Sequence, residues 1–295
     1  MKTNHQIIII LVILLGCSGN NHKSDAYGNF EATEITVSAL GQGQVLEFDL
    51  DEGSLLKKGQ RVGLIDTTDL HLKLQQLVES KAAVATRVPN INAQIKVQEQ
   101  QKANMMVDKE RIDKLYEDGA ATKKQVDDIN GALDLINVQI NSLEVQRASV
   151  YLEMETIDKQ VAQVREAIDK CTIINPIQGT VLVKFAEAGE VASIGRPLYK
   201  MADLENMKLK VYVSGDQLPH ISLGQEVEVL IDEDRKTNRQ MKGRVSWISE
   251  SAEFTPKTIQ TKEERVNLVY AVKVLVKNDG SLKIGMPGEI NFMKQ

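Results

Sequence analysis

The stretch ITVSALGQGQVLEFDLDEGSLLKKGQRVGLID, residues 35–66, returns in altered form as CTIINPIQGTVLVKFAEAGEVASIGRPLYKMA, residues 171–202. A constant offset of 136 residues aligns the two copies without a gap. In this alignment Gly43 falls on Gly179, Gly53 on Gly189 and Gly59 on Gly195. Equal glycine spacing predicts equal turn geometry, because glycine tolerates a positive φ angle at little cost.

Apolar residues also match between those turns, for example Val45 with Val181 and Val62 with Leu198. Short apolar stretches bounded by turns predict strands that bury one face. One copy is too small to bury that face alone, so we expect the two copies to pack on each other. The residues between the copies therefore form an insertion in one small β-sandwich.

Apolar residues recur at alternating steps of three and four along the second half of this insertion. This seam consists of Val126, Ile129, Leu133, Ile136, Ile140, Leu143, Arg147, Val150, Met154, Ile157, Val161, Val164 and Ile168. Such a repeat predicts a coiled-coil helix that needs a facing helix. The first half supplies a looser seam: Leu70, Leu74, Leu77, Lys81, Val84, Val88, Ile91, Ile95, Gln98, Lys102, Met105, Lys109, Ile112 and Tyr116. Because its part from Gln98 to Lys109 is mostly polar, we expect that part to be wetter or to gain neighbours from other subunits.

A short turn at residues 118–121 predicts that the two arms run antiparallel as a hairpin. Each arm has about 50 residues, which at about 1.5 Å per residue reaches about 70 Å. Pro89 lies inside the first arm, where its ring removes a helical hydrogen bond. We therefore expect a kink or a break near residues 87–90.

The chain after Met207 alternates apolar and polar residues and predicts strands. The clearest candidates are residues 207–213, 225–231, 244–248 and 270–276, with a final strand at 289–292. Short strands with regular turns favour one or two small barrels or sandwiches. We expect Trp247 in their core, and residues 250–265 as an exposed loop or hairpin end.

The N-terminus has the pattern of an export signal. Lys2 and His5 precede the apolar run Ile7–Leu15, which is shorter than the roughly 20 residues that span a bilayer. The Gly16-Cys17 pair resembles the lipobox of bacterial lipoproteins, which implies cleavage before Cys17 and lipid attachment to it. An ordinary signal peptide with an incidental cysteine is the alternative. The polar residues that follow read as a flexible tether.

Composition and spacing exclude several functions. The formal net charge of −5 is spread along the chain, which argues against a nucleic-acid partner. The four histidines lie far apart, and no catalytic triad or phosphate-binding loop is present, so we expect no metal, no cofactor and no enzyme activity. Cys171, the only cysteine besides Cys17, reads as a small buried apolar side chain.

Four segments together resemble the HlyD-type membrane fusion proteins, the periplasmic adaptor subunits of bacterial efflux and secretion pumps, and within them the lipoprotein subtype that serves ABC exporters. They are EGSLLKKGQ (52–60), NPIQGTV (175–181), SLGQEVEV (222–229) and LKIGMPGEI (282–290). The resemblance implies a mixed α+β fold, in which a long antiparallel coiled-coil hairpin is inserted in a lipoyl-like β-sandwich. A β-barrel domain and a membrane-proximal β-domain follow.

The domains expected from this resemblance have these boundaries. They are a signal peptide (1–16), a lipid-anchored linker (17–27), a lipoyl-like domain (37–67 with 171–203), a helical hairpin with its tip near 119 (68–170), a β-barrel domain (204–239, sharing strands with 240–295) and a membrane-proximal β-domain (28–36 with 240–295).

The resemblance implies an adaptor in the periplasm, held at the inner membrane by lipidated Cys17. Its partners would be an inner-membrane transporter of the ABC type, a TolC-like outer-membrane channel, and further copies of itself in a homohexamer. The family places arginine, leucine and serine at the hairpin tip for channel docking, and Arg111, Leu115 and Thr122 stand at that spacing. Thr122 replaces the serine and is also a plausible helix N-cap.

Two other classes stay open. The paired half-motifs are similar to lipoyl and biotinyl carrier domains, which display a modified lysine on the turn joining their halves. The hairpin replaces that turn here, and Lys57 and Lys58 stand at a different turn. The second alternative is a passive lipoprotein that spaces two membranes.

Overall fold

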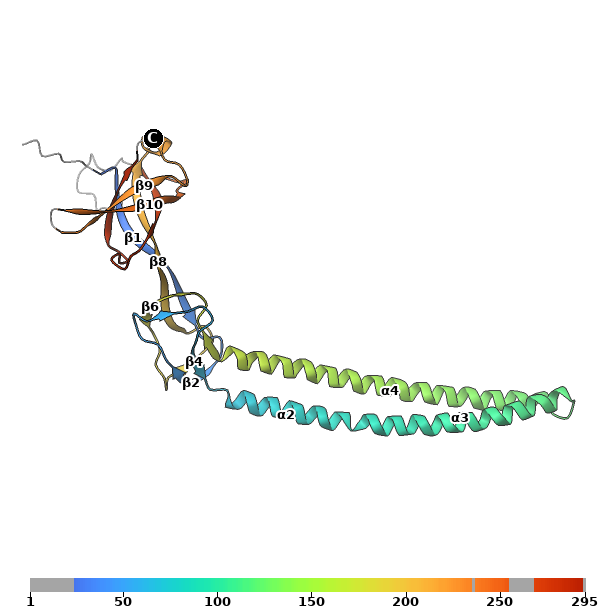
Figure 1. Cartoon of the computed structure of the whole chain (residues 1–295). Helices are drawn as coiled ribbons and strands as arrows, with labels where there is room; N and C mark the ends of the chain where they lie inside the picture. The colour runs from blue at the N-terminus through green and yellow to red at the C-terminus, as the bar shows by residue number, and fades with distance from the viewer. Residues whose placement is uncertain (1–23, 235–236, 255–267, 294–295) are drawn as a thin grey trace, which may run out of the picture.

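The structure is a computed structural model that describes residues 24–234, 237–254 and 268–293. A β-barrel, a small β-sandwich and a long helical hairpin follow one another in space (Figure 1). The predicted mixed α+β class and the helical hairpin are confirmed. The predicted signal peptide, Cys17 and most of the loop expected at 250–265 lie outside the described residues.

The two copies of the repeated stretch form the sandwich by exchanging strands. The first copy contributes β2 (Gly43–Phe48), β3 (Leu55–Leu56) and β4 (Arg61–Ile65), and the second contributes β6 (Gly179–Lys184), β7 (Val191–Ala192) and the start of β8 (Pro197–Ser214). β3 pairs with β6, and β7 pairs with β2. The pairs Gly43↔Ala192 and Leu56↔Gly179 are related by the 136-residue offset, so the two exchanges are equivalent.

The sandwich has one core to which both copies contribute, as the repeat predicts. Its fully buried members include Val45, Val62, Ile65, Val181, Leu198 and Met201. Cys171 is 1% exposed in this core, and burial followed by the charge of Asp66 raises the pKa of its thiol. The expectation of a buried, apolar cysteine is confirmed.

A buried polar clasp joins the two copies around Asn175. The Asn175 side-chain amide donates to the Lys57 carbonyl at 2.9 Å, and Tyr199 donates its hydroxyl to Asn175 Oδ1 at 2.9 Å. The Asn175 backbone exchanges hydrogen bonds of 2.8 Å with Gly59 and Gln60. Asn175 and Tyr199 are both 0% exposed, so each group depends on its partner for satisfaction.

Two of the three matched glycine pairs share the expected turn geometry. Their φ angles are +85° and +94° for Gly53 and Gly189, and +80° and +86° for Gly59 and Gly195. The third pair differs, because Gly43 has φ +144° whereas Gly179 has no positive φ. Gly179 is needed for space instead, since a Cβ there would lie 2.5 Å from the Ala202 carbonyl oxygen.

The hairpin consists of α2 (Thr68–Ala85), α3 (Arg87–Glu117) and α4 (Lys123–Lys170). The break between α2 and α3 falls at Thr86, one residue before the interval predicted from Pro89. Pro89 cannot donate to the carbonyl of Ala85, four residues earlier, and its ring crowds that carbonyl. Thr86 uses its hydroxyl to bond the Ala83 carbonyl at 2.6 Å, which satisfies an acceptor at the break.

The predicted seams face each other, with one exception. Buried seam residues of the sandwich-proximal half form a cluster of Val84, Ile91, Ile95, Val150, Ile157 and Val161. Tyr116, placed in the seam by periodicity, is 46% exposed, because the helices end close to it. The hairpin is also held by contacts of Lys81 with Asp158 (2.7 Å), Arg87 with Glu153 (2.8 Å) and Arg147 with Asn92 (3.1 Å).

The barrel closes because β8 pairs with both of its neighbours. The order β12-β10-β9-β13-β1-β8 returns to β12, with β1 (Ala26–Ser38), β9 (Glu226–Asp232), β10 (Asn238–Ile248), β12 (Leu268–Lys277) and β13 (Pro287–Phe292). The small strands β5 (Thr172–Ile174) and β11 (Glu253–Phe254) pair with β4 and β12. β1 and β8 continue beyond the barrel into the sandwich and connect the two (Figure 1).

The barrel core draws on every segment expected for the two β-domains, which the prediction lets share strands. Phe30, Val229 and Ile290 all belong to one cluster, although the prediction divides them among the membrane-proximal domain and the barrel domain. The division into two domains stays a prediction. β1 starts at Ala26, which is 1% exposed, so the strand begins two residues inside the expected linker.

Trp247 lies outside the barrel, and its predicted core position is wrong. The β10–β12 register shifts between Val245 and Trp247, and this β-bulge moves the tryptophan from the inner to the outer face. Trp247 is 42% exposed, and the Lys273 ammonium lies 5.3 Å from its ring centre.

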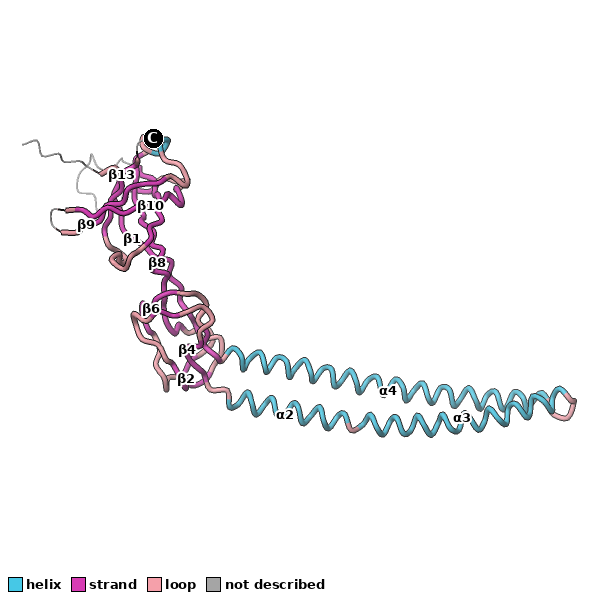
Figure 2. Tube along the Cα trace, viewed as in Figure 1, coloured by secondary structure: helices cyan, strands magenta, loops and turns pink. Residues whose placement is uncertain are grey.

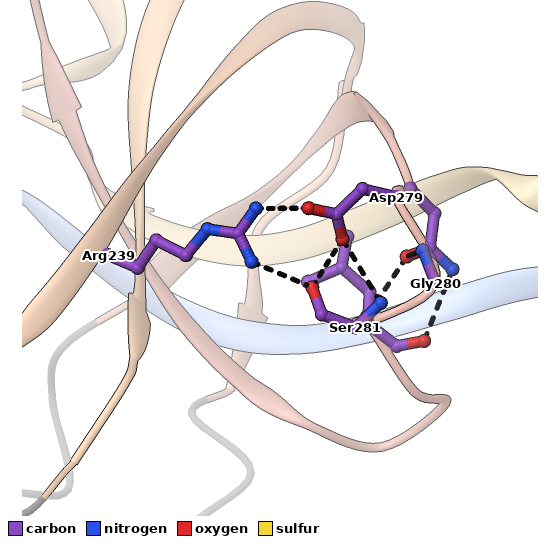
Figure 3. Close-up of polar contacts among 6 residues, drawn as sticks. Arg239, Asp279, Gly280 and Ser281 are labelled. Atoms are coloured by element: carbon purple, nitrogen blue, oxygen red, sulfur yellow. Dashed lines mark hydrogen bonds and ion pairs between the residues drawn. The ribbon is translucent and has the colours of Figure 1, made fainter.

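The loop before β13 is fixed to the start of β10 (Figure 3). Asp279 accepts hydrogen bonds from the Ser281 hydroxyl (2.6 Å) and backbone amide (3.1 Å), and it pairs with Arg239. The Ser281 bonds and then Arg239 lower the pKa of Asp279. Since both partners of the ion pair are about two-fifths exposed, it orients the loop more than it stabilises the barrel.

We predict that Asn175→Ala lowers the free energy of unfolding of the sandwich by about 2–4 kcal/mol, because the Lys57 carbonyl and the Tyr199 hydroxyl both lose a partner. Tyr199→Phe leaves one group unpaired and costs about 1–2 kcal/mol. Amide hydrogen exchange in β2, β4 and β6 measures both effects separately from the hairpin. Equal effects of the two variants would argue against a clasp centred on Asn175.

A pH dependence follows from the same clasp. Burial raises the pKa of Tyr199 from 10.0 to about 12. Between pH 10 and about 12 the unfolded chain releases the phenol proton while the folded chain keeps it, so stability falls as the pH rises through this window. Urea denaturation at pH 9 and pH 11 should show a smaller loss of stability in Tyr199→Phe than in the unaltered chain; an equal loss contradicts the assignment.

Candidate functional site: the hairpin tip

The tip is the end of the hairpin that lies farthest from the barrel (Figure 2). α3 ends at Glu117 and α4 begins at Lys123, with Gly119 at φ +74° between them. The amides of Ala120 and Ala121 both donate to the Leu115 carbonyl, at 2.7 and 3.1 Å. These bonds satisfy a helix-end acceptor and hold the turn against α3.

Thr122 caps the second arm, as its alternative interpretation expects. The Gln125 amide donates to Thr122 Oγ1 at 3.3 Å, and the Thr122 amide donates to Gln125 Oε1 at 2.7 Å. Thr122 Oγ1 also donates to Gln125 Oε1 at 3.0 Å. This reciprocal capping box uses the Thr122 hydroxyl within the chain.

Arg111 and Leu115 lie on α3, one helical turn apart, and both are accessible. The Arg111 side chain is 69% exposed and pairs with Asp108 at 3.4 Å. Because such an exposed ion pair is weak, Arg111 can turn toward another partner. Leu115 is 42% exposed. The structure thus places all three predicted residues at the tip, but it gives Thr122 an internal role and leaves Arg111 and Leu115 to face solvent.

Two tip residues were not found from the sequence. Gln125 completes the capping box, and the pattern of threonine followed three residues later by glutamine could have revealed it. Tyr116 adds exposed aromatic surface next to Leu115. Nearby, Lys114 donates to Glu110 at 2.8 Å, which lowers the pKa of Glu110 and raises that of Lys114.

The tip presents a small exposed apolar surface, Leu115 and Tyr116, among charged residues. Within the described ranges, no three histidine, cysteine, aspartate or glutamate side chains come together as metal ligands would. None of the helices in the described part of the chain is both long and apolar enough to cross a membrane.

The residues that lead from the first half of the sandwich into the hairpin include no lysine. β4 leads through residues 66–67 directly into α2, so the hairpin occupies the place of the carrier turn. Lys57 and Lys58 lie on the turn between β3 and β4 instead.

Solved structures of other proteins have a similar architecture. The chain is similar to MacA from Actinobacillus actinomycetemcomitans, with a TM-score of 0.56 and 21% identity over 90% of this chain and 76% of that one. It is equally similar in fold to the membrane fusion protein Spr0693 from Streptococcus pneumoniae R6, with a TM-score of 0.56 and 16% identity over 91% and 98% of the two chains. The chain therefore has the fold of the membrane fusion proteins.

Its sequence relatives are UPF0194 membrane proteins. YE2891 from Yersinia enterocolitica is 22% identical over 98% of both chains. YbhG from Salmonella gallinarum is 23% identical over 90% of this chain and 87% of that protein. A relative from Acidithiobacillus ferridurans is 26% identical over 90% and 86%. No family model matches the chain.

We predict that Thr122→Ala frays the start of α4 and costs about 1 kcal/mol, because the Gln125 amide loses the hydroxyl that caps it. Thr122→Ser keeps the hydroxyl and should be near neutral. Hydrogen exchange of the Gln125 and Val126 amides measures the effect, and equal exchange in both variants would show that the cap is not what holds the tip.

Proposed function

We propose that this protein is a non-enzymatic periplasmic adaptor that links an inner-membrane transporter to a TolC-like outer-membrane channel, for efflux or secretion across the envelope. The observation that carries the proposal is the hairpin. α4 runs without interruption for 48 residues, which corresponds to about 70 Å at 1.5 Å per residue. A rod of this length ending in a small docking surface connects distant partners and has no other evident use.

The attachment of the first described residues supports an orientation in which the barrel lies at the inner membrane and the hairpin points away from it. The first described residues are fastened to the barrel, since the Asp25 amide donates to the Ile290 carbonyl at 3.0 Å and Ser24 donates to Glu289 at 2.5 Å. Cys17 precedes Ser24 by seven residues, a tether of at most about 25 Å. A lipid on Cys17 therefore keeps the barrel at the membrane, and the transporter would meet it there.

The transporter class and the copy number come from the resemblance. We propose an ABC-type transporter and a homohexamer whose hairpins lie side by side. The relatives are named membrane proteins, which agrees with attachment to a membrane. Arg111 and Leu115 are the residues proposed to meet the channel, and Thr122 holds the turn between α3 and α4.

Neither alternative has comparable support. A lipoyl or biotinyl carrier needs a lysine at the junction where α2 begins, and Thr67, Thr68 and Asp69 stand there. An intact-mass measurement that shows a lipoyl or biotinyl group on a lysine would support the carrier function instead. A passive spacer needs no partner, so it would retain neither an ATP-driven permease nor a channel on purification.

The test is cross-linking in cells. A cysteine in place of Arg111 should form a cross-link with an outer-membrane channel, whereas one in place of Leu72, which is 61% exposed near the sandwich, should not. The tagged chain should also retain a permease. Failure to cross-link from Arg111 or Leu115 in a folded, membrane-attached chain would count against tip docking, and absence of a permease would count against the adaptor.

A further inference from the structure

A cavity of about 470 Å³ opens on the outer wall of the barrel, where β1 lies between β13 and β8. Its volume falls within the range of sites that bind small molecules. Its lining includes two tyrosines, Tyr27 and Tyr212, and two carboxylates, Asp232 and Glu289. The other described residues that line it are uncharged.

The strand register places these four side chains on one face of the barrel wall. Tyr27 is paired with Tyr212 on β8 and with Glu289 on β13. Residues directly opposite each other on neighbouring strands project from the same face. Asp232 lies two residues beyond Leu230, which is paired with Glu289, so it shares this face. Because Tyr27 is 45% exposed, the face is the outer one.

Two paired glycines line the middle of the cavity. Gly28 of β1 lies opposite Gly288 of β13. A Cβ at Gly28 would lie 1.8 Å from the Lys210 carbonyl oxygen, and one at Gly288 would lie 2.8 Å from the Phe30 ring, so neither position admits a side chain. Glycine inside a strand also lets a ligand approach the backbone closely. The glycine pair therefore gives the cavity a floor of bare backbone.

The two carboxylates of the cavity have no cationic partner. Ser24, which is 9% exposed, donates its hydroxyl to Glu289 at 2.5 Å, which orients this carboxylate without neutralising it. Neither carboxylate forms an ion pair with a lysine or arginine of the described ranges, and none of the described residues that line the cavity is basic. Arg239, on the neighbouring strand β10, pairs with Asp279 instead (Figure 3). Negative charge is thus left for a ligand to compensate.

One tyrosine of the cavity already binds an ammonium group of the chain. The Lys210 ammonium lies 5.3 Å from the Tyr212 ring centre and pairs with Glu253 at 3.4 Å. An aromatic face combined with a carboxylate is the arrangement by which proteins bind organic cations. Tyr27 and Glu289, paired across β1 and β13, offer the same two groups to a ligand.

The character of the lining changes in one direction across the wall. The strands follow one another in the order β9, β13, β1, β8 and β12. They contribute in turn Asp232, Glu289, Tyr27, Tyr212 and Val269. One end of the cavity is therefore acidic, its middle is aromatic and its other end is apolar.

We propose that this cavity binds an organic cation that carries an apolar group, such as an arylammonium or alkylammonium compound. The ammonium group lies beside Glu289 and Asp232 against the Tyr27 ring, and the apolar group extends over Tyr212 and Val269. This site goes beyond the proposed adaptor function and does not depend on it. In an efflux adaptor, such a ligand would belong to the cargo.

Ligand-detected NMR on the full-length chain in a non-ionic detergent tests the site, with benzyltrimethylammonium as the probe. We expect saturation transfer from the protein to this cation. We expect none to benzenesulfonate, which has the same ring and the opposite charge. Equal binding of the two compounds, or no binding of the cation, would overturn the proposal, and this comparison requires no variant.

Variants assign the binding to the cavity. Asp232→Asn, Glu289→Gln and Tyr27→Leu should each weaken binding of the cation about five-fold, because each removes one attractive group. The matched control is Glu226→Gln, which removes the same charge from the same face of β9, where Glu226 pairs with Arg244 at 3.6 Å. It should leave the affinity unchanged. A loss in this control equal to that in Asp232→Asn, or full affinity in Tyr27→Leu, would contradict the site.

Choline and phosphocholine distinguish a free cation from a lipid headgroup. Both carry the same ammonium group, and only phosphocholine adds a phosphate. Because the two carboxylates repel a phosphate, we expect choline to displace the probe at a lower concentration than phosphocholine does. Equal displacement would assign the cavity to a lipid headgroup and would overturn the binding of a free cation.

Failure of the cation site is distinguishable from failure of the adaptor function. Probe binding in a chain that neither cross-links from its tip nor retains a permease leaves the cation site standing and removes the adaptor. A chain that cross-links and retains a permease but does not bind the probe does the reverse.

Discussion

The fold depends on the exchange of short strands between two half-sandwiches that are far apart in the sequence. Neither copy of the repeated stretch closes its own core, since β3 completes the sheet of the second copy and β7 that of the first. The exchange brings β4 and β5 together, with Leu64 opposite Thr172, so the ends of the inserted segment are adjacent. Once those ends are held, a long insertion costs little additional loop-closure entropy, particularly when it pairs with itself. The hairpin can therefore be long without weakening the domain that carries it.

The 136-residue offset also relates the two strand pairs that connect the sandwich to the hairpin and to the barrel. It carries the β4–β5 pair Arg61↔Ile174 onto the β8–β1 pair Pro197↔Ser38, and Gly63↔Ile173 onto Tyr199↔Val37. One of these equivalent ribbons leads into the hairpin and the other into the barrel (Figure 1). The sandwich is therefore pseudo-symmetric, and the hairpin and the barrel are attached to it at equivalent positions. The proposed function uses this arrangement, with the barrel at the membrane and the hairpin directed away from it.

Periodic features were predictable from the sequence, and features set by a single residue were not. The seam of α4 could be predicted because thirteen positions follow the same spacing of three and four residues. A single β-bulge before Trp247 turns that side chain to the outer face, and the alternation of apolar and polar residues does not reveal it. Equal spacing also could not show that two matched glycines are needed for different reasons. Gly43 has a positive φ angle, whereas Gly179 lies too close to the Ala202 carbonyl for a side chain. At the tip, spacing located Arg111, Leu115 and Thr122, but whether the Thr122 hydroxyl is available depends on the rotamer of Gln125.

The distribution of apolar surface along the hairpin links its stability to its assembly. The buried cluster of the seam ends near Ile95 and Leu143. Beyond it the first arm offers Gln98, Lys102 and Lys109 to the apolar seam of α4, and Gln98 Oε1 is buried without a hydrogen-bond partner among the described residues. The same distal half of α4 exposes Leu135 and Val138 on its outer side. A helix whose facing seam is partly polar and whose outer side is bare can gain further packing from neighbours. In the proposed homohexamer the neighbouring copies would supply this packing, so that the proposed channel would meet an assembled set of tips.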